Sequence, residues 1–84
     1  MNNFITTQEE IDNFLKNIVY LRNKNNFSKK EMAKKLKISL YSLNIIENGK
    51  IPPNLTVELL LNIEKEFDIL PSHLFKDLKN KNQE

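Results

Sequence analysis

The sequence predicts an all-α protein, a compact five-helix domain built around two short helices joined by a tight turn. Two observations support this class. Apolar residues recur at intervals of three and four along most of the chain, and Ser or Thr residues that can cap helices precede these stretches. A length of 84 residues corresponds to one domain. We expect its core at about 8–78, with flexible ends at 1–6 and 79–84.

The first helix is expected at about Gln8–Lys24. Thr7 and Glu10 have the spacing of a capping box at its start. Asn25 and Asn26 can adopt left-handed conformations and end the helix, and Phe27 is expected to fill the core behind it. The apolar residues three and four apart, which predict its inward face, are Ile11, Phe14, Leu15, Ile18 and Leu21.

The central pair of helices covers Ser28 to Gly49. Ser28 and Glu31 form a second capping box, so a helix is expected at about Lys29–Leu36. Ser39 can cap the next helix, about Leu40–Asn48, and the following Gly49 is a stop signal. Helices of this length are unstable alone in water and must pack on their neighbours. The residues expected to face inward from the pair and its turn are Met32, Ala33, Leu36, Ile38, Leu43 and Ile46.

A linker and two more helices are expected after Gly49. Pro52 and Pro53 favour an extended linker, and Thr56 is placed to cap a helix at about Val57–Phe67. Pro71 then suits the first turn of a fifth helix. The fourth helix is predicted to bury Val57, Leu60, Ile63 and Phe67, and the fifth Leu74, Phe75 and Leu78.

Positive charge is concentrated on the central pair. Residues 22–50 contain eight Lys or Arg and two acidic residues, a net charge of +6, whereas 1–21 and 51–84 each carry −2. A basic segment of this kind is typical of a nucleic-acid-binding surface. A solvated lysine face in a lysine-rich chain is the alternative interpretation.

Several classes of function are not indicated. The chain has no cysteine and one glycine, and its only histidine, His73, is expected to be an exposed helix residue. No nucleophile arrangement, metal-ligand cluster or glycine-rich loop is recognisable, so we expect no catalysis, no cofactor and no small-molecule ligand. Neither an apolar run of membrane-spanning length nor a signal peptide is seen, which favours a cytoplasmic location.

The central pair resembles the helix-turn-helix of the Cro and phage-repressor family, the lambda-repressor-like DNA-binding domains. The resemblance extends from about Ile18 to Phe75, and Lys37 and Asp68 stand where the family often has glycine. It implies a transcriptional regulator that binds double-stranded DNA sequence-specifically. The matching positions are Met32, Ala33, Leu36, Ile38, Ser39, Leu43, Ile46, Glu47 and Gly49.

The resemblance also implies that the second helix of the pair enters the major groove. On that basis the predicted base contacts are Leu40, Tyr41, Ser42, Asn44 and Ile45. Asn44 can pair with adenine, and Leu40 and Ile45 can pack on thymine methyl groups. The predicted phosphate contacts are Ser28, Lys29, Lys30, Ser39, Asn48 and Lys50.

Lys29 and Lys30 lie in the first turn of a helix, where cations are unfavourable. A bound phosphate would compensate for them, and the family position of Lys29 usually contacts the DNA backbone.

Two partner predictions accompany this interpretation. Apolar residues beyond the needs of one small core predict a weak homodimer through the N-terminal segment or the last two helices; they are Phe4, Ile5, Val19, Leu59 and Leu61. Leu40 and Ile45 fit a protein-binding face equally well. The alternative function is therefore an antitoxin-like or antirepressor-like interaction module that binds a protein partner.

Overall fold

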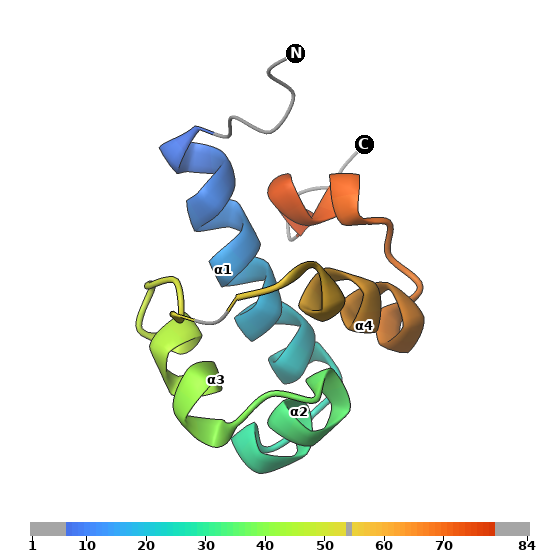
Figure 1. Cartoon of the computed structure of the whole chain (residues 1–84). Coiled ribbons are helices and arrows are strands. Elements are labelled where there is room, and N and C mark those ends of the chain that lie inside the picture. Colours follow the sequence, from blue (N-terminus) through green and yellow to red (C-terminus); the bar gives the residue numbers. More distant parts are fainter. Residues whose placement is uncertain (1–6, 54, 79–84) are drawn as a thin grey trace.

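Four α-helices and a short 3₁₀ helix make up the fold, in a computed structural model that describes residues 7–53 and 55–78 (Figure 1). The elements are α1 (Gln8–Lys24), α2 (Lys29–Leu36), α3 (Leu40–Glu47), α4 (Val57–Phe67) and the 3₁₀ helix η1 (Pro71–Phe75). The described residues contain no β-strand, so the predicted all-α class is confirmed. The predicted flexible ends, 1–6 and 79–84, lie outside the described residues.

The predicted capping boxes start the first two helices. The Thr7 hydroxyl accepts a hydrogen bond from the Glu10 N–H at 3.1 Å, and the Glu10 carboxylate accepts one from the Thr7 N–H at 3.0 Å. Ser28 and Glu31 make the same exchange at 3.1 and 2.8 Å. Thr56 precedes α4 as predicted, but its side chain makes no capping hydrogen bond.

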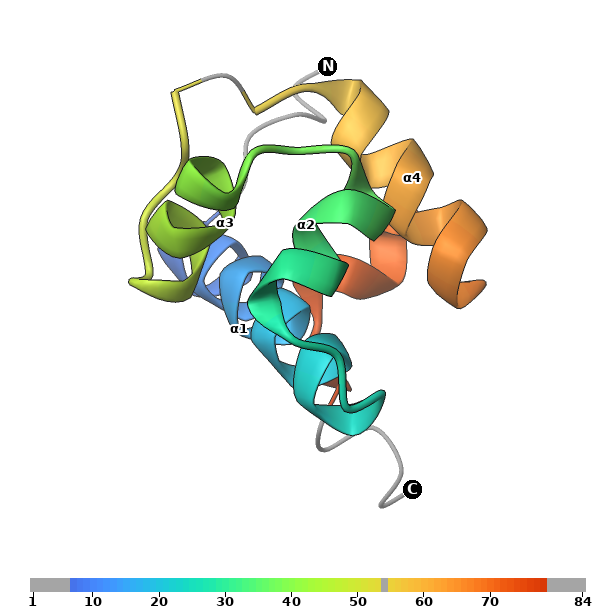
Figure 2. The ribbon, with the colours of Figure 1, turned by 90° about the horizontal axis from the view of Figure 1, so that it is seen from below.

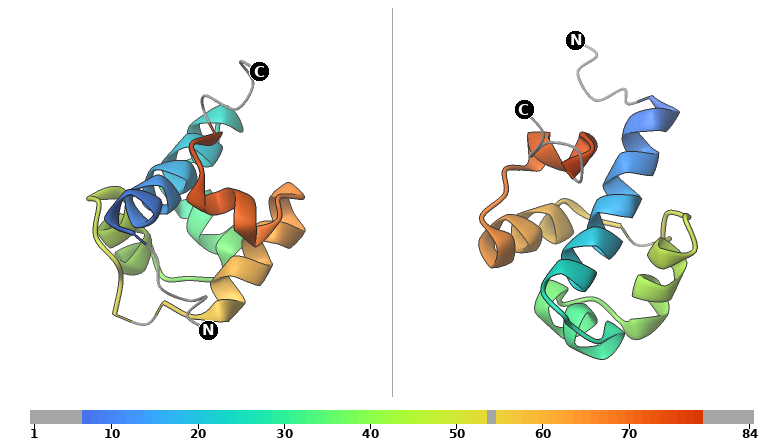
Figure 3. Two further views of the ribbon diagram at one scale, coloured as in Figure 1. Left: turned by 90° about the horizontal axis from the view of Figure 1, so that it is seen from above. Right: turned by 180° about the vertical axis from the view of Figure 1, so that it is seen from behind.

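The long helix α1 organises the packing. It contacts α3 and η1, while α2 packs on α3 and α4 (Figures 1 and 3). The rings of Phe14 and Phe75 stack with centroids 5.4 Å apart and join α1 to η1. Because α2 and α3 share this core, neither short helix has to be stable by itself. The buried apolar residues are Phe14, Leu15, Ile18, Leu21, Met32, Ala33, Leu36, Leu43, Ile46, Leu59, Ile63, Leu74 and Leu78.

The inward face of α4 differs from the prediction. Val57 is 69% exposed, whereas Leu59, predicted to lie outside the core, is only 3% exposed. The polar residue Asn62 explains the difference, because it is buried and its amide donates to the Leu36 carbonyl at 3.1 Å. The helix therefore turns Leu59, Asn62 and Ile63 inward, and Leu60 packs at the edge of the core.

The predicted fifth α-helix is a five-residue 3₁₀ helix instead. Asn17 of α1 supplies the physical reason. Its amide nitrogen donates to the Leu74 carbonyl at 2.7 Å, and its amide oxygen accepts from the Leu78 N–H at 3.2 Å. These two backbone groups would bond to each other in an α-helix. The Asn17 side chain thus replaces that α-helical hydrogen bond and ties the C-terminal segment to α1.

His73, predicted to be exposed, is half-buried in η1. None of the described helices is long and apolar enough to cross a membrane.

We expect Asn17→Ala to destabilise the protein by about 2–3 kcal/mol, because it leaves buried backbone groups without partners. The Asn17 amide also donates to the Lys76 carbonyl at 2.6 Å. Asn13→Ala is the matched control, since Asn13 makes a single bond to the Phe75 carbonyl at 3.2 Å and should cost about 0.5–1.5 kcal/mol. Urea unfolding of both variants measures the difference, and equal losses would contradict this role of Asn17.

Candidate nucleic-acid interface

The turn between α2 and α3 sets the angle of the pair. Lys37, which stands where the family often has glycine, has a left-handed conformation with φ 61°. Its N–H donates to the Lys34 carbonyl at 3.2 Å, and the Ile38 N–H donates to the Ala33 carbonyl at 3.0 Å. These two hydrogen bonds form a Schellman motif, which ends α2 sharply. Ile38 then packs its half-buried side chain against the core, as predicted.

At both ends of α3, neighbouring residues form the hydrogen bonds that cap the helix. The Ser39 hydroxyl accepts from the Ser42 N–H at 3.0 Å and caps the helix, as predicted. At the other end, Gly49 has φ 81°. The Gly49 and Lys50 N–H groups donate to the Ile46 and Ile45 carbonyls at 2.9 and 3.1 Å, another Schellman motif. Helix α3 is therefore well defined over its eight residues.

One side of α3 faces away from the core (Figure 2). Leu40 is 44% exposed and Tyr41 70% exposed, Asn44 and Asn48 are exposed, and Ile45 is half-buried. Residues at these spacings lie on neighbouring turns of one helix side.

The prediction for Ser42 is wrong, since Ser42 is only 5% exposed and turns inward. Its hydroxyl lies 3.1 Å from that of Ser39, which donates to it. Ser42 therefore belongs to the capping arrangement of α3 and is not part of the exposed side.

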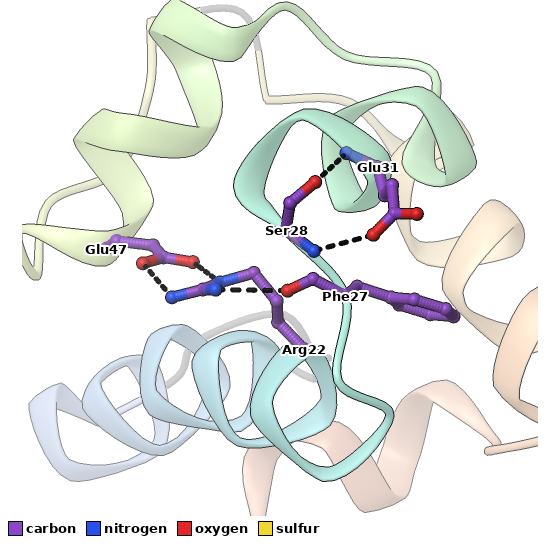
Figure 4. A network of polar contacts seen from close by, with 5 residues as sticks. All are labelled: Arg22, Phe27, Ser28, Glu31 and Glu47. Atoms are coloured by element: carbon purple, nitrogen blue, oxygen red, sulfur yellow. Dashed lines mark hydrogen bonds and ion pairs between the residues drawn. The ribbon is translucent and has the colours of Figure 1, made fainter.

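An ion pair that the sequence pattern did not predict holds α1, α2 and α3 together (Figure 4). The Arg22 guanidinium donates to the two carboxylate oxygens of Glu47 at 2.6 and 3.1 Å. Its third nitrogen donates to the Phe27 carbonyl at 3.1 Å, just before α2 begins. The two side chains are mostly buried, with 18% and 9% exposed. One side chain of α1 thus fixes both the end of α3 and the approach to α2.

The start of α2 exposes the predicted phosphate contacts Ser28, Lys29 and Lys30. Because the Ser28 hydroxyl accepts from the Glu31 N–H, the N–H groups of Lys29 and Lys30 are those left open by the cap. The Glu31 carboxylate already satisfies the Ser28 N–H. An anion at this end would therefore meet two backbone N–H groups and two lysine side chains.

The other basic residues fall into two groups. Lys34, Lys37 and Lys50 are exposed, and none pairs with a carboxylate among the described residues. Lys34 and Lys37 were not among the predicted phosphate contacts, although Lys30, Lys34 and Lys37 follow the three- and four-residue helical spacing. Lys35 differs, because its ammonium lies 5.0 Å from the Phe27 ring centroid and 4.0 Å from a Glu66 carboxylate oxygen. Lys35 therefore serves the contact between α2 and α4.

Among the described residues, no group of three His, Cys, Asp or Glu side chains is placed to hold a metal ion. The structure instead presents an exposed side of α3 flanked by basic residues. Its chemistry is hydrogen bonding and apolar contact on α3, with positive charge on α2 and just beyond both ends of α3.

Comparison with known proteins agrees with this geometry. A family model described as helix-turn-helix matches residues 18–74, which is most of the chain. The chain belongs to the Cro/repressor-type helix-turn-helix family, a family of DNA-binding domains. No curated protein and no solved structure matches it.

We expect Lys37→Gly to leave the protein equally stable or more stable. A left-handed conformation costs a side-chain-bearing residue about 1–2 kcal/mol, while glycine costs about 0.5–1 kcal/mol in backbone entropy. Lys34→Gly makes the same change inside α2 and should destabilise by about 1 kcal/mol. Thermal melts compare the two variants, and similar losses of stability in both would show that the turn at Lys37 is unstrained.

Proposed function

We propose that the protein is a transcriptional regulator that binds double-stranded DNA sequence-specifically, with α3 in the major groove and the start of α2 on a phosphate. The proposal rests most directly on the exposed side of α3 and on the Arg22–Glu47 ion pair that fixes α3 relative to α2. A helix of this kind, held by a preceding helix, is the docking element of helix-turn-helix proteins. The protein would act in the cytoplasm, where the DNA is.

Base contacts in this proposal come from Leu40, Tyr41, Asn44 and Ile45. Phosphate contacts come from Lys29 and Lys30 with the open N–H groups of α2, and from Asn48 and Lys50 at the end of α3. Ser28 and Ser39 are exposed beside these groups, although their hydroxyls also cap the two helices. Phosphate contacts fix the register of a protein on DNA, and base contacts provide its specificity.

A homodimer on a two-fold symmetric operator completes the proposal, with half-sites about 10 base pairs apart. Of the apolar residues first assigned to the dimer surface, Leu59 is buried in the core. Leu61 is 50% exposed and Val57 69% exposed, so α4 still presents an apolar surface. Val19 is half-buried, and Phe4 and Ile5 lie outside the described residues.

A protein-binding module is the second candidate. The observation that favours it is the exposure of Leu40 and Tyr41 at the start of α3, because exposed apolar side chains side by side often mark protein interfaces. The positive charge around α3 favours DNA over this alternative.

Two substitutions distinguish the proposed phosphate contacts from the proposed base contacts. Lys29→Ala should weaken binding to operator and random duplex alike, and should reduce the slope of log affinity against log salt by about one unit. Asn44→Ala should cost about 1–3 kcal/mol on the operator, and little on random duplex. Fluorescence anisotropy across a salt series, on duplexes from upstream of the protein's own gene and on scrambled duplex, measures both effects.

Lys35→Ala is the matched control for Lys29→Ala, because it removes a lysine of α2 that contacts Phe27 and Glu66. Its salt slope should equal that of the parent protein. Equal losses on both duplexes for Asn44→Ala would contradict base readout by α3. If no duplex binds even at low salt, the DNA proposal fails and Leu40 and Tyr41 become the centre of a protein-binding face.

A further inference from the structure

The exposed side of α3 carries an unusual set of side chains for reading DNA. It presents two aliphatic residues, Leu40 and Ile45, one aromatic residue, Tyr41, and two amides, Asn44 and Asn48. The helix sequence, Leu-Tyr-Ser-Leu-Asn-Ile-Ile-Glu, contains no Arg, Lys, Gln or His. Its possible contacts with base edges are therefore restricted in kind.

Each base pair offers the major groove a different pattern of groups. Guanine presents two acceptors, which proteins read most often with Arg or Lys, and cytosine presents an amino donor, which Glu or Asp accepts. Adenine pairs with the amide of Asn or Gln, and the thymine methyl group packs on apolar side chains. The exposed side of α3 thus matches adenine and thymine and lacks the usual partners of guanine and cytosine.

Glu47, Ser42 and Ser39 of the α3 region are already engaged in contacts within the fold. Glu47, the only acidic residue of α3, accepts from Arg22 with both carboxylate oxygens. Ser42 is buried, and the Ser39 hydroxyl donates to it. Neither Glu47 nor Ser42 is free to turn toward a cytosine or guanine without breaking these contacts.

The basic residues nearest to α3 lie beyond its ends. Lys37 precedes the capping Ser39, and Lys50 follows the Gly49 that ends the helix. Their side chains are exposed, and in the proposed complex they would lie nearer to phosphates at the edges of the site than to its central bases. In such a complex the positive charge would supply affinity, and the amide and apolar groups of α3 would supply the contacts at the base edges.

We infer that the base pairs facing α3 in the operator are A·T pairs, with adenine read by Asn44 and thymine methyl groups packed against Leu40 and Ile45. This inference rests on the proposed function, and it names the class of sequence that the interface recognises. It assigns specificity to methyl contacts and one amide, and it assigns no guanine contact to α3.

Selection of bound duplexes from a random pool, using the full chain, is the first test. The central positions of a half-site are those at which Asn44→Ala or Leu40→Ala alters the base preference. We expect these positions to be A·T pairs in the enriched duplexes. A required G·C pair at such a position would overturn the inference while leaving sequence-specific DNA binding intact. If no sequence is enriched, the proposed function itself fails, and the inference fails with it.

Removal of single methyl groups is the second test. Replacing a central thymine with uracil deletes only its methyl group, and we expect affinity to fall by about fourfold per buried methyl. In the Leu40→Ala or the Ile45→Ala variant the same replacement should have a smaller effect at the thymine that each residue contacts. Leu70→Ala is the matched control, since Leu70 is an exposed leucine outside α3 and α4 and its loss should leave the uracil effect unchanged.

The uracil replacement can also contradict the inference. If uracil replaces every central thymine without loss of affinity, the methyl groups are not contacted and the assignment of Leu40 and Ile45 is wrong. An equal uracil effect in the parent, Leu40→Ala and Ile45→Ala proteins would also overturn it.

Discussion

The Arg22–Glu47 ion pair is the contact on which the geometry of the interface depends. It connects α1, the longest helix, to the last residue of α3, and the same guanidinium holds the Phe27 carbonyl before α2 (Figure 4). Bidentate pairs between Arg and a carboxylate fix direction as well as distance. Because α2 and α3 have eight residues each, they depend on contacts with the rest of the fold, and this ion pair is a contact that reaches both of them.

Buried asparagines play a related part elsewhere in the fold. The Asn62 amide of α4 donates a hydrogen bond to the Leu36 carbonyl at the end of α2. Asn17 of α1 holds the C-terminal segment through three hydrogen bonds. Buried polar groups of this type cost free energy unless they are fully paired, and when paired they specify one arrangement.

Much of the fold follows from local sequence, and two wrong predictions, the inward face of α4 and the form of η1, share a cause. The inward face of α1, the capping boxes at Thr7 and Ser28, and the left-handed conformation at Lys37 depend on residues close together in sequence. The face of α4 was predicted wrongly because Asn62, a polar residue, is buried against α2. The form of η1 was predicted wrongly because Asn17, which replaces an α-helical bond there, lies 57 residues before Leu74.

The candidate site, too, could be predicted from the sequence only in part. The exposure of Leu40, Tyr41, Asn44 and Asn48 follows from helical spacing once Leu43 and Ile46 face inward. The burial of Ser42 depends on a hydroxyl contact with Ser39 that spacing does not reveal. The Arg22–Glu47 pair joins residues 25 positions apart, so the charges were visible in the sequence but their pairing was not.

A double-mutant cycle between Arg22 and Glu47 tests most directly whether this ion pair holds α2 and α3 in the position that the proposed DNA binding requires. Arg22→Met, Glu47→Gln and the double variant are compared by urea unfolding, and by operator binding at a temperature where all three remain folded. We expect a coupling free energy of about 0.5–3 kcal/mol in unfolding, and weaker operator binding in each single variant. Additive effects on unfolding, with operator affinity equal to that of the parent protein, would contradict the account.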